Sequence, residues 1–203
     1  MTAKQRWENY WYHYKWHTVI GLFLAFTLAV GITQCALRPR YDQNAVLYCD
    51  RVISDRASEA LAEALSHRIA DSDGDGTPRF EVYNVAYSSQ SKVQQTDFAN
   101  AQKIMALVSS ADYVLYIVDG YGYDRLMLDD NMQLFEACGL PHKNGTAWNW
   151  QGSPLQTELA GTGLPEELYF CVRKVAGTAA EHNADAAGRA ERALALIKTL
   201  MAE

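Results

Sequence analysis

The sequence pattern with the clearest chemistry is the acidic run DSDGDG at residues 71–76. Its carboxylates, Asp71, Asp73 and Asp75, stand at alternate positions and can therefore wrap around one hard cation, while Gly76 permits the sharp turn of such a loop. The pattern predicts a structural Ca²⁺ site that ties the end of a helix to the start of a strand. The alternative is an acidic turn that binds no ion.

The end of this loop departs from the EF-hand pattern. An EF-hand loop has a Glu at its last position, which is Val82 here, whereas Glu81 comes one residue early and in a predicted strand. The backbone carbonyl of Thr77 and the carboxylate of Glu81 complete the predicted ligand set. The loop thus resembles the DxDxDG calcium loops of secreted proteins, whose weak affinity is suited to extracellular calcium.

A second set of polar residues follows two apolar runs that predict strands. Asp50 comes directly after the run 45–49, and Asp119 and Tyr121 come after the run 112–118. In open α/β sheets, ligands bind outside the carboxyl ends of the strands, so these three residues are predicted to line a pocket. The alternative for each is an ordinary turn or capping residue.

Two tryptophans, Trp148 and Trp150, lie in a glycine-containing loop. If they are exposed, their rings can stack on a ligand or a partner chain; if they are buried, they cover the sheet. The motifs GxSxG, HExxH and Walker A do not occur in the sequence. We therefore expect a protein without catalytic activity, with an anchored hydrolase as the less favoured alternative.

The elements that must position these residues alternate along the chain. Apolar runs predict four strands, at 45–49, 79–87, 112–118 and 168–175. Helical periodicity predicts helices at 54–69, 97–108, 123–138 and 183–201, and the segment 141–163 is expected to be loop-rich. This alternation implies an α/β fold: a three-layer sandwich with a mainly parallel sheet of about four strands.

An uncharged stretch, residues 18–37, precedes these elements. At a rise of about 1.5 Å per residue it can cross a hydrocarbon core of about 30 Å as one transmembrane helix. The aromatic run WENYWYHYKWH before it is typical of the membrane interface. We expect an interfacial tail at 1–17, a signal anchor at 18–37, a linker at 38–44 and a domain at 45–203. Cleavage near residues 29–31 is the alternative to retention of the anchor.

The net charge and the expected membrane topology restrict the kinds of partner and the location that this protein can have. From Tyr41 onward the chain has 13 Lys and Arg residues against 23 Asp and Glu residues, which argues against nucleic acid as a partner. Basic residues are balanced on the two sides of the anchor. The large following domain and the calcium-type loop favour an extracytoplasmic domain on a single-pass membrane protein. A disulfide between Cys49 and Cys171 is left open.

The order strand, helix, DxDxDG turn, strand, helix and then ADYVLYIVDGYGYDRL resembles the first lobe of bacterial extracellular solute-binding proteins of the type II periplasmic-binding fold. The resemblance covers about residues 45–140 and implies a ligand pocket at the strand ends, although the chain is too short for two lobes. The whole chain also resembles small membrane-anchored proteins of unknown function from Gram-positive gut bacteria.

These observations favour one function over its alternative. We expect a membrane-anchored extracytoplasmic binding or interaction module, stabilised by Ca²⁺. Its expected partners are the lipid bilayer, through residues 18–37, and a membrane protein or a small-molecule ligand. The alternative is a solute-binding accessory of a transporter.

Overall fold

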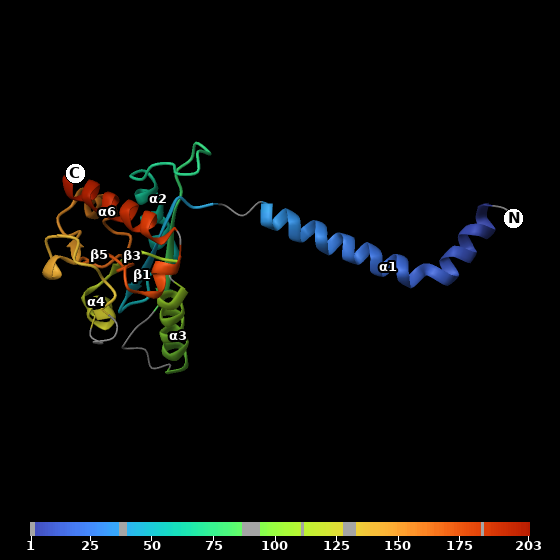
Figure 1. Cartoon of the computed structure of the whole chain (residues 1–203), viewed down its shortest axis with the longest axis horizontal. Helices are drawn as coiled ribbons and strands as arrows, with labels where there is room; N and C mark the ends of the chain where they lie inside the picture. The colour runs from blue at the N-terminus through green and yellow to red at the C-terminus, as the bar shows by residue number, and fades with distance from the viewer. Residues whose placement is uncertain (1–2, 37–39, 87–93, 111, 128–132, 184) are drawn as a thin grey trace. The chain divides into compact units, whose positions relative to one another are not determined.

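The structure is a computed structural model that describes residues 3–36, 40–86, 94–110, 112–127, 133–183 and 185–203 (Figure 1). The chain divides into two compact units, Met1–Arg40 and Tyr41–Glu203. Each unit is described by itself.

The first unit is one helix, α1 (Ala3–Ala36), whose stretch Tyr10–Gln34 is long and apolar enough to cross a membrane. Its large apolar side chains are exposed, as a surface in contact with lipid requires. The hydroxyls of its threonines Thr18, Thr27 and Thr33 each donate to the carbonyl four residues earlier, at 2.7–3.0 Å. These polar groups are therefore satisfied within the helix. The last residue of the predicted anchor, Leu37, lies outside the described residues.

The second unit contains a five-stranded sheet and its helices. The strands are β1 (Gln43–Cys49), β2 (Phe80–Ala86), β3 (Leu115–Val118), β4 (Ala147–Asn149) and β5 (Tyr169–Val172). The helices are α2 (Asp55–Ser66), α3 (Gln94–Ser110), α4 (Gly120–Met127), α5 (Pro154–Glu158) and α6 (Ala186–Ala202), with short 3-10 turns at Lys143–Gly145 and Ala179–His182.

The sheet is mixed, which corrects the prediction of a mainly parallel sheet of about four strands. The strand order is β2-β1-β3-β5-β4. β1 pairs in parallel with β2 and β3, whereas β5 pairs antiparallel with both β3 and β4. After α4 the chain passes through the short strand β4 and α5 in place of a long crossover helix, and antiparallel neighbours need no such crossover.

Strand β1 supplies side chains to both faces of the sheet because successive residues of a strand point in opposite directions. One set lies in a core with α2 and α6, here called the α2/α6 core; its β1 members are Ala45, Leu47 and Cys49. The other set, Val46 and Tyr48, lies in the α3/α4 core with residues of α3 and α4. Figure 1 shows the same division, with α2 and α6 on one side of the strands and α3 and α4 on the other.

The helix predicted at 123–138 is wrong beyond α4. Among the described residues of that range, α4 ends at Met127 and residues 133–138 are not helical. Instead Phe135 forms an antiparallel bridge with Arg173, and the backbone N–H of Lys174 donates to the carbonyl of Leu134 at 2.7 Å. Leu134 and Phe135 are buried in the α3/α4 core, so this segment is held by packing on the extension of β5.

Candidate functional site

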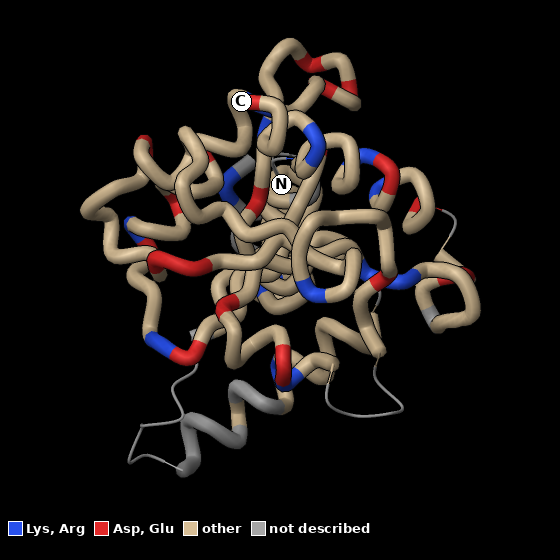
Figure 2. Tube along the Cα trace, turned by 90° about the vertical axis from the view of Figure 1, so that its left-hand side faces the viewer, with Lys and Arg blue, Asp and Glu red and all other residues tan. Residues whose placement is uncertain are grey.

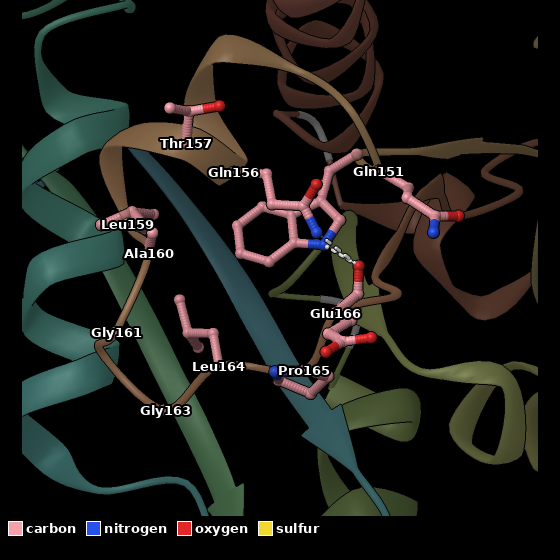
Figure 3. Close-up of a pocket in the computed structure, with 11 residues that line it drawn as sticks. Gln151, Gln156, Thr157, Leu159, Ala160, Gly161, Gly163, Leu164, Pro165 and Glu166 are labelled. Atoms are coloured by element: carbon pink, nitrogen blue, oxygen red, sulfur yellow. Dashed lines mark hydrogen bonds between the residues drawn. The ribbon is translucent and has the colours of Figure 1, made fainter.

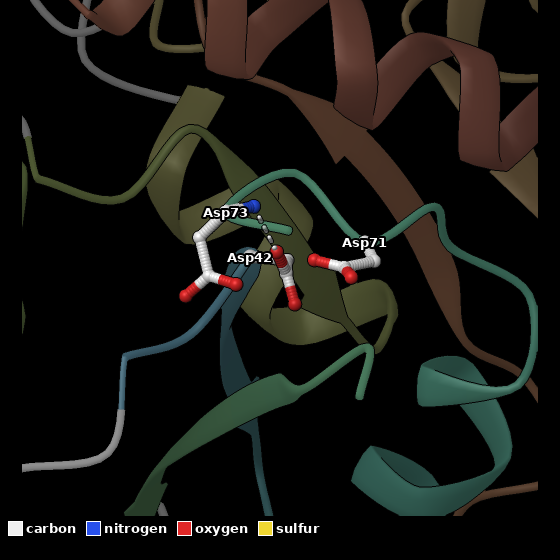
Figure 4. Close-up of side chains that lie close together, drawn as sticks. All are labelled: Asp42, Asp71 and Asp73. Carbon is white, nitrogen blue, oxygen red and sulfur yellow. Dashed lines mark hydrogen bonds between the residues drawn. The ribbon is translucent and has the colours of Figure 1, made fainter. Parts of the chain in front are cut away.

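The acidic loop brings together a set of carboxylates that includes one residue not predicted from the sequence. Oxygens of Asp42, Asp71 and Asp73 lie within 4.8 Å of one another (Figure 4). Asp42 directly precedes β1, and the other two follow α2. This group of three acids could hold a metal ion.

Asp42 is buried and ties the loop to the start of β1. Its Oδ1 accepts hydrogen bonds from the backbone N–H of Ser72 at 2.6 Å, from the Ser72 hydroxyl at 2.8 Å and from the N–H of Asp73 at 3.2 Å. Its Oδ2 accepts from the N–H of Arg79 at 2.9 Å. Burial acts to raise the pKa of Asp42, but these four donors outweigh it and lower the pKa to about 2. The carboxylate is therefore ionised across the physiological range.

Asp71 holds the turn itself. Its two oxygens accept from the backbone N–H groups of Gly76 and Gly74, each at 2.7 Å. These bonds lower the pKa of Asp71, although the nearby charge of Asp42 acts to raise it. Both glycines have positive φ angles, 85° and 75°, which a side chain would strain. The loop is therefore held in shape by backbone N–H groups that donate to the carboxylates of Asp42 and Asp71.

The other predicted ligands do not join the group of three acids. The Oδ1 of Asp75 accepts the N–H of Thr77 at 2.8 Å, and its Oδ2 pairs with the guanidinium of Arg79 at 3.0 Å. Glu81 lies on β2, where burial raises its pKa and the hydroxyl of Tyr113 partly offsets that effect. Since alternate residues of β2 face opposite sides of the sheet and Phe80 faces the α2/α6 core, Glu81 points to the other face.

The loop has the chemistry of a hard-cation site. Negative charges on carboxylates this close repel one another, and a divalent cation would offset that repulsion. The oxygen ligands match those preferred by Ca²⁺, which takes six to eight of them. Asp42 Oδ1 already accepts three hydrogen bonds, whereas Asp42 Oδ2 and the two oxygens of Asp71 accept one backbone N–H each and keep a lone pair for a cation.

At the carboxyl ends of β1 and β3, Asp119 acts as a cap. Its Oδ2 accepts from the backbone N–H of Asp50 at 2.7 Å, and its Oδ1 accepts from the N–H of Gly122 at 2.7 Å. The Asp119 carboxylate thus links the end of β1 to the first turn of α4. Gly122 is required there, because a Cβ at this position would lie 2.5 Å from the carbonyl oxygen of Tyr48.

A hollow of about 430 Å³ lies beside this cap. Its lining includes Asp119, Arg51, Glu166 and Glu167. Of the three residues predicted to line a strand-end pocket, Asp119 lines this hollow, whereas Asp50 and Tyr121 are not among its lining residues. The burial of Cys49, with the charge of Asp119, raises the pKa of the Cys49 thiol, which makes it a packing residue and not a nucleophile.

A second hollow, of about 670 Å³, shares Leu164, Pro165 and Glu166 with the first (Figure 3). Trp150 lines it, and the indole N–H donates to the carbonyl of Glu166 at 3.1 Å. The side-chain amide of Gln156 donates to the same carbonyl at 2.7 Å. The two hollows, which share residues 164–166 as lining, are here together called the strand-end groove, defined by Arg51, Asp119, Trp150 and residues 164–167.

The two tryptophans differ from an exposed stacking pair. Trp148 is buried in the α2/α6 core with its ring 5.3 Å from that of Phe170, and Trp150 is 2% exposed. Both therefore cover the sheet, and Trp150 alone of the two lines the groove. Cys49 and Cys171 are free thiols in different cores, so the disulfide left open by the sequence is not formed.

Acidic and basic residues are interspersed along the trace of the second unit (Figure 2).

Comparison with models of protein families, with characterised proteins and with solved structures found no match to this chain. Function is therefore inferred from the geometry alone.

Proposed function

We propose that this chain is a membrane-anchored binding module whose acidic unit faces the extracytoplasmic side and does not catalyse a reaction. The observation that carries the proposal is the pairing of a 25-residue apolar span, none of it buried, with a second unit that has its own cores. A helix with exposed apolar side chains all round is stable in lipid and not in water.

The strand-end groove is the proposed binding surface, for a membrane protein or a small-molecule ligand. It combines an apolar wall of Trp150 and Leu164 with the charged groups of Arg51, Glu166 and Glu167. Both oxygens of Asp119 are engaged by backbone donors, which supports binding over acid–base catalysis at this end of the sheet. The second unit, with a separate core on each face of its sheet, is in this proposal a three-layer sandwich.

A solute-binding accessory of a transporter is the second candidate. The 670 Å³ hollow favours it, because this volume lies within the range of small-molecule pockets. A thermal-shift screen of the full chain against small solutes separates the two candidates. Stabilisation by a solute that Trp150→Ala abolishes supports the transporter accessory, whereas capture of a membrane protein without any solute effect supports the interaction module.

Reporter fusions at the C-terminus test the topology. An alkaline phosphatase fusion is expected to be active and a green fluorescent protein fusion dark, because the first folds outside the cytoplasm and the second inside. Fusions to residues 41–203 alone provide the matched control and should reverse both readings. A bright fluorescent fusion of the full chain would place the second unit in the cytoplasm and contradict the proposal.

Ca²⁺ is the proposed ligand of the Asp42, Asp71 and Asp73 group. For a dissociation constant near about 0.5 mM, typical of extracellular sites, 5 mM Ca²⁺ would stabilise the unit by about 1.4 kcal/mol. The melting temperature should then rise by about 3–6 °C, and a chelator should reverse the rise. Asp73→Asn should abolish the response while Asp185→Asn, on an exposed residue of the same unit, should keep it. An equal response in Asp73→Asn would exclude this site.

A further inference from the structure

A narrow crevice between the start of β1 and α6 is lined by two buried donors, Gln43 Nε2 and Arg192 Nε, that have no hydrogen-bond partner among the described residues. It measures about 290 Å³ and lies at the other end of β1 from the strand-end groove. Its polar lining includes Gln43, Arg68 and Arg192, and its apolar lining includes Ile69 and Leu196.

Gln43 is the buried donor of this crevice. It is 4% exposed, and its side-chain Nε2 has no hydrogen-bond partner among the described residues. Gln43 lies on the same face of β1 as Ala45 and Leu47, which pack in the α2/α6 core, so its side chain points towards α6. A buried amide without a partner destabilises the fold, and a ligand that supplies an acceptor removes that destabilisation.

Arg192 supplies the charge on the opposite wall. Its Nε is buried and has no hydrogen-bond partner in the described part of the chain. Its Nη2 lies 3.9 Å from the carboxylate of Asp185, too far for a hydrogen bond. The other arginine, Arg68, is already engaged, because it pairs with Glu203 at 2.8 Å and with Glu158 at 2.9 Å. Arg192 is therefore the cation of the crevice that a ligand can use.

The acid that lines the crevice does not compete for these donors. Asp42 accepts four hydrogen bonds from the loop at 72–79, so its oxygens are turned to that loop. The other polar lining groups, the hydroxyls of Ser72 and Thr199, donate to Asp42 Oδ1 and to the carbonyl of Ala195. The rest of the wall is apolar, formed by Ile69, Ala70, Ala195 and Leu196. A crevice of this size is below the range of drug-sized ligands, so its occupant is small.

We propose that this crevice binds a short-chain carboxylate, with the carboxylate accepting from Gln43 Nε2 and Arg192 and the apolar tail lying against Ile69 and Leu196. A guanidinium and an amide both donate in plane, which suits the two oxygens of a carboxylate. The inference does not depend on the function proposed for the strand-end groove.

Titrations of the full chain in detergent micelles test the proposal, with butyrate, butyramide and inorganic phosphate as probes. Butyrate should bind saturably and shift the side-chain amide signal of Gln43 in ¹⁵N-labelled protein, a signal identified by its loss in Gln43→Met. Arg192→Gln should weaken butyrate binding at least tenfold. Arg189→Gln, one turn earlier on α6 and outside the lining of the crevice, should change it less than twofold.

Equal binding of butyramide, equal butyrate binding by Arg192→Gln, or the absence of saturable binding by butyrate would overturn the proposal. Binding of inorganic phosphate without butyrate would also overturn it, because the apolar wall would then have no role. The Gln43→Met variant keeps the side-chain volume, and its melting temperature shows separately whether it folds.

Discussion

The polar side chains that pack at the two ends of β1 differ in their hydrogen bonding. At the carboxyl end, both oxygens of Asp119 accept backbone N–H groups at 2.7 Å. At the amino end, the buried Nε2 of Gln43 and Nε of Arg192 have no partner among the described residues. Groups of the first kind hold the fold together, whereas groups of the second kind lower its stability until something binds. A residue can therefore lie at the predicted place in the fold and still be unavailable to a ligand.

Asp119→Ala is the strongest way to break this comparison. It removes two charge-assisted hydrogen bonds and leaves the N–H groups of Asp50 and Gly122 without their acceptor. We expect a loss of about 3 kcal/mol, which lowers the melting temperature by about 6–12 °C. Asp119→Asn, which keeps one oxygen, should lose less. An unchanged melting temperature would show that the carboxylate does not hold the strand end.

Asp42, at the amino end of β1, lines the crevice but holds the fold together as Asp119 does, because its carboxylate accepts four hydrogen bonds. Its pKa is lowered to about 2 in the folded state from 3.8, so its contribution is complete above about pH 4 and is lost as the pH falls towards 2. The linked free energy is about 2 kcal/mol. Denaturant unfolding at pH 7 and at pH 2 should show a larger acid loss for the wild type than for Asp42→Asn. Equal losses in the two proteins would contradict the role given to Asp42.

Gln43→Met gives the smallest effect, with the opposite sign. Because the Gln43 amide nitrogen is buried without a partner, an apolar side chain of similar volume should stabilise the ligand-free protein by about 0.5–1 kcal/mol. The melting temperature should rise by about 1–4 °C in a thermal scan. Gln156→Met is the matched control and should lower the melting temperature. The Gln156 amide donates to the carbonyl of Glu166 and its Oε1 accepts the N–H of Gly152, each at 2.7 Å. A lower melting temperature for Gln43→Met would mean that its amide is satisfied.

Local signals predicted the elements that carry their own patterns. The apolar runs predicted β1 and β3, and the helical periodicity predicted α2. The antiparallel direction of β5 could not be predicted, because an apolar run has the same pattern whether it pairs in parallel or antiparallel. Strand β4 has three residues, too few for an alternation to show.

The site was less predictable than the fold because its residues meet across the chain. The alternating acids identified Asp71 and Asp73, but Asp42 joins them from the chain before β1, where a single Asp carries no motif. Gln43 and Arg192 are far apart in the sequence, near the first and the last residue of the second unit. An amide without an acceptor also has no sequence signature. The acidic net charge did not predict these donors, because net charge describes the whole surface and not one crevice.

The position of β3 in the middle of the sheet has a consequence for how the chain is made. One edge of this fully buried strand is covered by β1, which is synthesised earlier, and the other by β5, which is synthesised much later. Until β5 emerges, β3 presents an apolar edge with open hydrogen-bonding groups, which is a template for aggregation. A nascent chain in this state depends on rapid synthesis of its last third, so premature termination between β3 and β5 would produce an aggregation-prone protein and not merely a shorter one.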